Sequence, residues 1–160
     1  MPAARAPDPS RAESYTAARR FRSRRRGHRT QVLRLKRQLP AKPDSVRQLR
    51  HWAVAYAAEV CEPDDQLQAD IALCVSEAAS NVVNHADAAH AAHALIDLEV
   101  YHTDSRLVVQ VSDEGVGMDE VELADTGLRI ISELATLTIG SQPRGATVTM
   151  TFPCPTPPEA

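Results

Sequence analysis

The chain has 160 residues, 43% of them hydrophobic and 4% aromatic, and its formal net charge at pH 7 is −3. This length suits one domain with an aliphatic core. The sequence contains no apolar run of about 18 residues, the minimum for a membrane-spanning helix, and its first residues lack the apolar stretch of a secretory signal. We therefore expect a cytoplasmic protein without a membrane span.

Positive charge is concentrated in residues 1–29, which carry nine Arg against Asp8 and Glu13, a formal +7. The rest of the chain carries nine Lys or Arg against nineteen acids, a formal −10. Because this first segment has almost no large apolar side chains, it cannot offset the entropy of ordering, and we predict a disordered basic tail. A transit peptide and a nucleic-acid-binding arm are the alternatives. Poor amphipathicity argues against the first, and a shortage of aromatic side chains for base stacking argues against the second.

The chain has three cysteines, Cys61, Cys74 and Cys154. They are far apart, odd in number and mostly in apolar surroundings, which argues against a disulfide framework or a cysteine-based zinc site and favours buried, inert thiols. Four histidines follow one another over a short stretch: His85, His90, His93 and His102. Imidazoles can gather zinc, but no cysteine or carboxylate pattern completes a tetrahedral set, so exposed loop histidines are the favoured interpretation.

Hydrophobic periodicity predicts the secondary structure. The expected elements, in chain order, are a strand over 30–40, helices over 45–60 and 64–86, a hairpin over 93–113, a helix over 126–137 and a hairpin over 136–152. Asp44 or Ser45 is expected to cap the first helix, on which Trp52 and Tyr56 are predicted to be core residues. The order β-α-α-β-β-α-β-β predicts an α+β fold, a two-layer α/β sandwich with a mixed, mostly antiparallel sheet covered by helices on one face.

Three polar residues recur every four positions in "VSEAASNVVNHAD": Glu77, Asn81 and His85. On a helical wheel they form one row at the margin of the apolar face. A carboxylate there could take a proton, and an amide oxygen is a suitable ligand for Mg²⁺. The alternative is a row of polar residues that simply meets solvent.

Two glycine-bearing segments follow this helix. "DEGVG", Asp113 to Gly117, comes directly after a predicted strand, where the aspartate could accept a hydrogen bond from an exocyclic amine and the glycines let a ligand approach. "TGL" places Gly127 just before a helix, whose N-terminus can seat phosphate. Each segment alone is equally typical of an ordinary turn.

Taken together and in this order, "SEAASNVVNHA", "DEGVG", "TGL" and "GATVTMTF" resemble the histidine-kinase-like ATPase superfamily, and within it the short bacterial anti-sigma-factor serine/threonine kinases. The resemblance covers roughly residues 30–152. It implies an ATPase domain over residues 30–153, between the basic tail and a disordered, Pro-rich end over 154–160.

The resemblance also implies roles for individual residues. Glu77 would be the general base toward the substrate hydroxyl, and Asn81 would bind Mg²⁺ and the nucleotide. Asp113 would recognise the adenine amino group, with Gly115 and Gly117 allowing the nucleotide close. The remaining assignments place Gly127 beside the phosphates, Thr147 near the adenine and His85 in a supporting role.

The function implied is transfer of the ATP γ-phosphate to a serine or threonine of an anti-sigma antagonist protein, together with sequestration of a sigma factor. Phosphoryl transfer needs mainly positioning and charge neutralisation, which one base, one Mg²⁺ and a helix N-terminus can supply. The alternative is a catalytically weak or inactive partner-binding module of the same fold, because Asp125 replaces a family glycine and the acidic lid over 118–126 is short. Nucleic-acid contact through the basic tail and homodimerisation are further open alternatives.

Overall fold

The computed structural model describes residues 33–85, 93–114, 126–141 and 145–155. The predicted basic tail lies outside these residues. The helices are α1 (Pro43–Val60), α2 (Asp65–His85) and α3 (Thr126–Leu134). The strands are β1 (Arg34–Pro40), β2 (Leu95–Thr103), β3 (Arg106–Asp113), β4 (Thr136–Ser141) and β5 (Ala146–Pro153). The predicted order of elements is confirmed.

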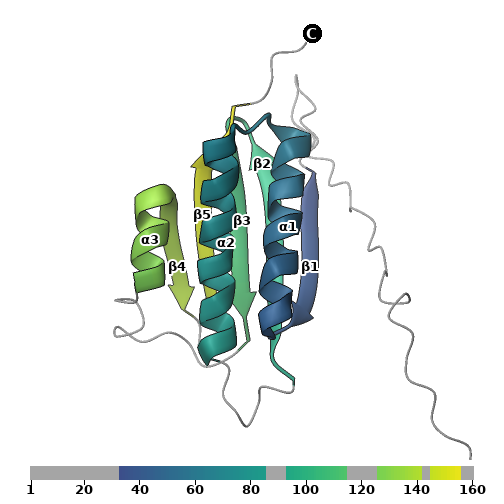
Figure 1. Cartoon of the computed structure of the whole chain (residues 1–160), viewed down its shortest axis with the longest axis vertical. Helices are drawn as coiled ribbons and strands as arrows, with labels where there is room; N and C mark the ends of the chain where they lie inside the picture. The colour runs from purple at the N-terminus through teal and green to yellow at the C-terminus, as the bar shows by residue number, and fades with distance from the viewer. Residues whose placement is uncertain (1–32, 86–92, 115–125, 142–144, 156–160) are drawn as a thin grey trace, which may run out of the picture.

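The five strands form one sheet in the order β1-β2-β3-β5-β4, and α1, α2 and α3 all cover the same face of it (Figure 1). The predicted α+β two-layer sandwich is therefore confirmed. All four strand pairings are antiparallel, whereas a partly parallel, mixed sheet was expected. Hairpins join β2 to β3 and β4 to β5, and consecutive strands joined by such short connections pair antiparallel.

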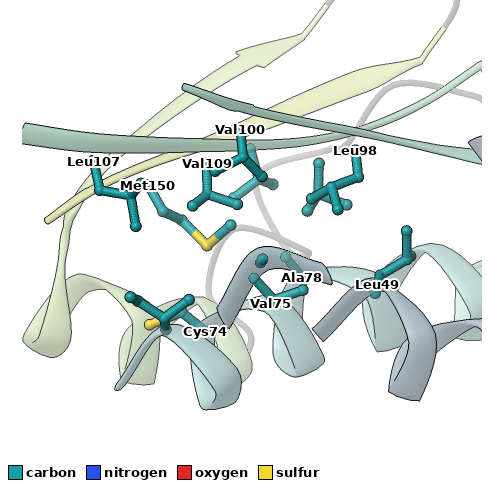
Figure 2. Packing of buried hydrophobic residues seen from close by; sticks show 14 of the residues in the cluster. Leu49, Cys74, Val75, Ala78, Leu98, Val100, Leu107, Val109 and Met150 are labelled. Carbon is teal, nitrogen blue, oxygen red and sulfur yellow. The ribbon is translucent and has the colours of Figure 1, made fainter. Parts of the chain in front are cut away.

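The core lies between the sheet and the helices, because alternate strand residues point toward the helical layer. Figure 2 shows aliphatic side chains of the strands directed at Leu49 of α1 and at Cys74, Val75 and Ala78 of α2. The largest fully buried side chain is Phe152 of β5. Removing a side chain of this kind from water stabilises the fold by about 1.5–3 kcal/mol.

The two long helices begin differently. The α1 helix starts at Pro43 with Lys42 as its cap residue, so the expected cap at Asp44 or Ser45 is wrong by two or three positions. Proline suits a first helical position because its missing N–H would have no helical partner there. At α2 the Asp64 carboxylate accepts a hydrogen bond from the Leu67 N–H at 2.7 Å, which caps the helix where it was predicted to begin.

Tyr56 belongs to the buried core, as predicted, and Trp52 is partly buried and packs against it. The Arg37 guanidinium lies over the Trp52 ring at 5.3 Å from its centroid. The Tyr56 hydroxyl donates to the Leu33 carbonyl, and burial raises the pKa of this phenol. These contacts attach α1 to the edge strand β1.

A disulfide joins Cys61, directly after α1, to Cys154, directly after β5, with a Cα–Cα distance of 5.9 Å. The prediction of three inert thiols is therefore wrong for these two residues and holds only for Cys74, which is free and buried. No short cysteine spacing indicates this bond, because the two cysteines are 93 residues apart and meet only through the fold. Cys154 is 1% exposed and belongs to the buried core cluster.

Candidate functional site

Three of the predicted site residues, Glu77, Asn81 and Gly127, lie together where α2 and α3 meet. Gly127 is the second residue of α3, and its backbone lies against the polar row of α2. A Cβ atom built on Gly127 would lie 2.7 Å from Glu77 Oε2 and 3.6 Å from Asn81 Oδ1. Because Gly127 has no side chain, the start of α3 comes this close to the Glu77 carboxylate without displacing it. The structure therefore brings Glu77, Asn81 and Gly127 together from segments fifty residues apart.

Asn81 is one of two buried polar residues among the described positions, at 9% exposure, and its side-chain Nδ2 has no hydrogen-bond partner there. A buried polar atom without a partner is costly, and a bound ion, water or ligand is one way to satisfy it. The two ends of an amide can exchange places by rotation about the last side-chain bond. Asn81 can therefore present either a donor or an oxygen ligand to the space beside Gly127.

Glu77 is half-buried, one helical turn before Asn81. Its carboxylate has a buried neighbour on the same helix, the Cys74 thiol, which sequence reasoning did not connect with the site. Burial and the nearby carboxylates of Asp70 and Glu77 raise the pKa of Cys74 to about 12. The thiol thus stays protonated at neutral pH and adds no charge to the site.

Asp113 marks a second part of the site, at the end of β3. Its Oδ1 accepts a hydrogen bond from the backbone N–H of Ala146, the first residue of β5, at 2.9 Å. Gly145 precedes it with a φ of +97°, and a Cβ there would lie 2.0 Å from the Asp113 carbonyl oxygen. A glycine is required because this φ is left-handed and because the backbone of Gly145 lies directly against the backbone of Asp113. The bond holds the Asp113 carboxylate at the junction of β3 and β5.

Thr147 is not brought together with these residues. Its neighbours Ala146 and Val148 are buried on the helical side of β5, so the alternation of a strand turns Thr147 to the opposite face. There its hydroxyl shares a 3.0 Å hydrogen bond with Ser112 of β3. The expected position of Thr147 beside the adenine therefore does not follow from this arrangement, and Ala146 occupies the helical side instead.

Three further residues of the sequence interpretation, Gly115, Gly117 and Asp125, lie outside the described residues, as does most of the acidic lid. His85, at the end of α2, is exposed, and so is His93. The carboxyl end of β3, the start of β5, the second half of α2 and the start of α3 all lie at the same end of the molecule, the lower end of Figure 1. The site residues that the structure describes thus form two groups at one end of the sandwich.

This arrangement combines four chemical capacities. Glu77 can accept a proton, Asn81 can act as an oxygen ligand, the start of α3 provides the positive end of a helix dipole, and Asp113 can accept a hydrogen bond from an amine. An anionic group between α2 and α3 would meet the dipole and the amide, whereas the Glu77 carboxylate requires a cation or a proton donor nearby. Such a combination suits a nucleotide with a metal ion.

None of the described helices has both the length and the apolar character needed to cross a membrane. No curated protein matches the chain. A model of the histidine kinase-like ATPase domain matches residues 39–152, which run from the end of β1 into β5 and include every site residue discussed above. By this match and by its α+β fold, the chain belongs to the histidine kinase-like ATPase domain family and carries that family's ATP-binding type of domain.

Proposed function

We propose that the chain is an ATP-dependent protein serine/threonine kinase that binds ATP and Mg²⁺ between α2 and α3 and phosphorylates an anti-sigma antagonist protein. The observation that carries this proposal is the close approach of Gly127 to Glu77, because a Cβ atom on Gly127 would lie 2.7 Å from Glu77 Oε2. Beside them lies the buried Asn81, whose Nδ2 has no hydrogen-bond partner among the described residues. A base and a metal ligand then lie together at a helix N-terminus, where phosphates bind. Resemblance to anti-sigma-factor kinases supplies the partner classes, the antagonist and a sigma factor that the chain sequesters.

The residues present fit Mg²⁺. Asn81 is buried, lacks a partner for Nδ2 and can turn its amide oxygen toward the same space. Glu77 is one turn away and would help to balance the positive charge. When bound, the metal ion would neutralise charge on the phosphate oxygens.

Glu77 is proposed as the general base. Its carboxylate would accept the proton of the serine or threonine hydroxyl while the hydroxyl oxygen forms a bond to the γ-phosphorus. The bond from the γ-phosphorus to the β–γ bridging oxygen breaks, and ADP leaves with the electron pair. Asp113 would orient the adenine by accepting a hydrogen bond from its amino group, since Oδ1 is held by Ala146 and Oδ2 is left for a ligand.

Two substitutions separate binding from chemistry. Asn81→Ala removes the proposed metal ligand, and we expect at least a tenfold loss of Mg-ATP affinity in a calorimetric titration. Glu77→Gln keeps the shape beside Gly127 and removes the base. It should retain Mg-ATP binding while phosphate transfer to the antagonist protein falls about 10²–10⁴-fold.

Asn84→Ala is the matched control, because Asn84 is an asparagine of the same helix, α2, but is exposed. It should leave both measurements unchanged. Unchanged Mg-ATP affinity in Asn81→Ala would refute the site. If Mg-ATP binds and Glu77→Gln transfers phosphate at the wild-type rate, the role of Glu77 is wrong. A wild-type chain that forms a partner complex but produces no heat with Mg-ATP would instead be a non-catalytic binding module.

A further inference from the structure

Three possible metal ligands meet at the opposite end of the molecule from the candidate ATP site. Cys61 follows α1, His102 lies near the end of β2, and Cys154 follows β5, and these ends gather at the upper end of Figure 1. One ligand atom of each residue lies within 4.8 Å of the other two. The disulfide accounts for the two sulfur atoms but gives no reason for the imidazole beside them.

The imidazole is held in the form that a metal requires. His102 Nε2 lies 2.6 Å from the Cys154 carbonyl oxygen. Because a carbonyl can only accept, Nε2 must carry the hydrogen, which leaves the lone pair of a neutral imidazole on Nδ1. Histidines that bind metals commonly donate their second ring N–H to a backbone carbonyl in this way. The carbonyl here belongs to Cys154, so the hydrogen bond also holds two of the three possible ligands, His102 and Cys154, next to each other.

All three residues are fixed by the fold. The Cys61 N–H donates to the Ala57 carbonyl at 2.9 Å, and the Cys154 N–H donates to the Ser105 carbonyl at 2.7 Å. His102 pairs with Leu107 across β2 and β3. Both cysteines are 1% exposed, whereas His102 is only half-buried, so the histidine is the most solvent-exposed of the three residues. A preformed set of ligands lowers the entropy cost of binding an ion.

The chemistry of the set favours a thiophilic divalent cation. Two thiolates and an imidazole are ligands of Zn²⁺, with Zn–S near 2.3 Å, so a tetrahedral ion would hold the two sulfur atoms roughly 3.8 Å apart. The Cα–Cα distance of 5.9 Å lies within the range for a disulfide, and small side-chain rotations would bring the sulfur atoms to the wider spacing. Two thiolates also balance the charge of the ion, which matters at a buried position.

We propose that Cys61, His102 and Cys154 form a Zn²⁺ site when the disulfide is reduced. A dithiol or phosphine reductant supplies two electrons and the medium two protons, converting the disulfide to two thiols. Zn²⁺ then displaces the two thiol protons and binds both thiolates and the imidazole, with water as the fourth ligand. The disulfide and the metal site exclude each other, and either one joins the end of α1 to the end of β5. This site is independent of the proposed kinase activity.

The test uses the whole chain, reduced with a phosphine, freed of metal with a chelator and exchanged into buffer without either. Calorimetric titration with Zn²⁺ should give one ion per chain. Titration with Co²⁺ should give the intense visible bands of a tetrahedral ion and the near-ultraviolet band of thiolate ligation. His102→Ala and Cys61→Ser should each weaken Zn²⁺ binding at least tenfold and remove or shift the Co²⁺ bands.

Two matched controls remove a similar group elsewhere. Cys74→Ala deletes the free buried thiol, and His93→Gln deletes an exposed histidine; both should bind Zn²⁺ as the wild type does. The oxidised wild type should not bind with thiolate bands. The proposal is overturned if the reduced chain binds no Zn²⁺, if His102→Ala leaves affinity and spectrum unchanged, or if the oxidised chain binds equally well. Circular dichroism of each variant shows whether a loss reflects unfolding, and Cys61→Ser and His102→Ala provide two separate chances to see the effect in a folded chain.

Discussion

Gly127 shows how one residue can fix a site without taking part in its chemistry. Its α-carbon lets α3 approach the Glu77 carboxylate, where a Cβ would lie 2.7 Å from Oε2. The obstacle is the far end of a flexible, half-buried side chain, so Gly127→Ala would be accommodated by moving the carboxylate and not the backbone. Alanine also favours a helix over glycine by roughly 0.5–1 kcal/mol.

We therefore expect Gly127→Ala to change the free energy of unfolding by less than about 1 kcal/mol while phosphate transfer falls at least about tenfold, since misplacing a reacting group by about 1 Å is costly. Urea unfolding and a transfer assay measure the two effects. Gly140→Ala is the control, because a Cβ at Gly140 meets nothing within 4 Å. Full activity of Gly127→Ala would argue that the Glu77 position is not critical.

Cys74 permits a pH test of the environment beside Glu77. Burial first, and then the carboxylates of Asp70 and Glu77, raise the thiol pKa from 9.0 to about 12. Below pH 9 the thiol is protonated in both the folded and the unfolded chain. Between pH 9 and 12 the unfolded chain is mostly thiolate and the folded chain mostly thiol. The small thiolate fraction of the folded chain therefore keeps rising with pH, while that of the unfolded chain levels off.

Alkylation of Cys74 by iodoacetamide, without reductant, should consequently rise about tenfold from pH 9 to pH 10 in the folded chain, because the thiolate is the reactive form. In urea the rate should approach a plateau over the same interval. Mass spectrometry of the Cys74 peptide measures both rates. A folded-state rate that levels off near pH 9 would contradict the raised pKa.

At the scale of elements, the end of β3 and the start of β5 depend on Gly145. Its φ of +97° is unfavourable for other residues, and a Cβ would lie 2.0 Å from the Asp113 carbonyl oxygen, a backbone atom that cannot rotate away. We expect Gly145→Ala to lower the free energy of unfolding by about 2 kcal/mol or more, as measured by urea unfolding. Mg-ATP affinity should also fall, because the Ala146 N–H that holds the Asp113 carboxylate would move.

Gly140→Ala again provides the comparison, since Gly140 lies in β4 of the same sheet and has open space around its Cβ position. Its unfolding free energy should change far less than that of Gly145→Ala. Equal effects of the two substitutions would mean that the loss reflects glycine in a strand in general and not the contact with Asp113.

Periodicity made the elements predictable, because each helix and strand has an apolar face that must reach one core. It also singled out Glu77 and Asn81 as candidate site residues, since residues four apart lie on one side of a helix. The strand face of Thr147 was harder to assign. Its motif suggested a site residue, but the apolar residues Val148, Met150 and Phe152 occupy the helical side and turn the threonines outward.

Contacts between segments far apart in the chain could not be predicted from the sequence pattern. The approach of Gly127 to α2 could be inferred only through the resemblance of the motifs to a known family. Cys61, His102 and Cys154 come from three elements, and their spacings match no metal or disulfide pattern. Their proximity depends on where α1, β2 and β5 end, and those ends are the least certain feature of a prediction from periodicity.

For the molecule as a whole, the bond between Cys61 and Cys154 encloses every described residue of the candidate ATP site, with α2 to β5 lying between the two cysteines. Cross-linking residues 93 apart restricts the unfolded chain, and the entropy model gives about 4.6 kcal/mol for a loop of this size, with measured values typically 2–4 kcal/mol. The cross-link also connects the two layers, since α1 covers the sheet to which β5 belongs.

Reduction should therefore lower the free energy of unfolding by about 2–4 kcal/mol, measured by urea unfolding with and without a phosphine reductant and with a chelator present to exclude metal. The double variant Cys61→Ser/Cys154→Ser should unfold at the same urea concentration under both conditions, near the midpoint of the reduced wild type. Cys74→Ala should keep the full response to the reductant, because its thiol is not in the bond. Coincident midpoints for the oxidised and reduced wild type would mean that the disulfide does not add to the free energy of unfolding.

Adding Zn²⁺ to the reduced chain in place of the chelator should restore part of the lost stability, since an ion held by both cysteines closes the same loop. The double variant should show no such recovery.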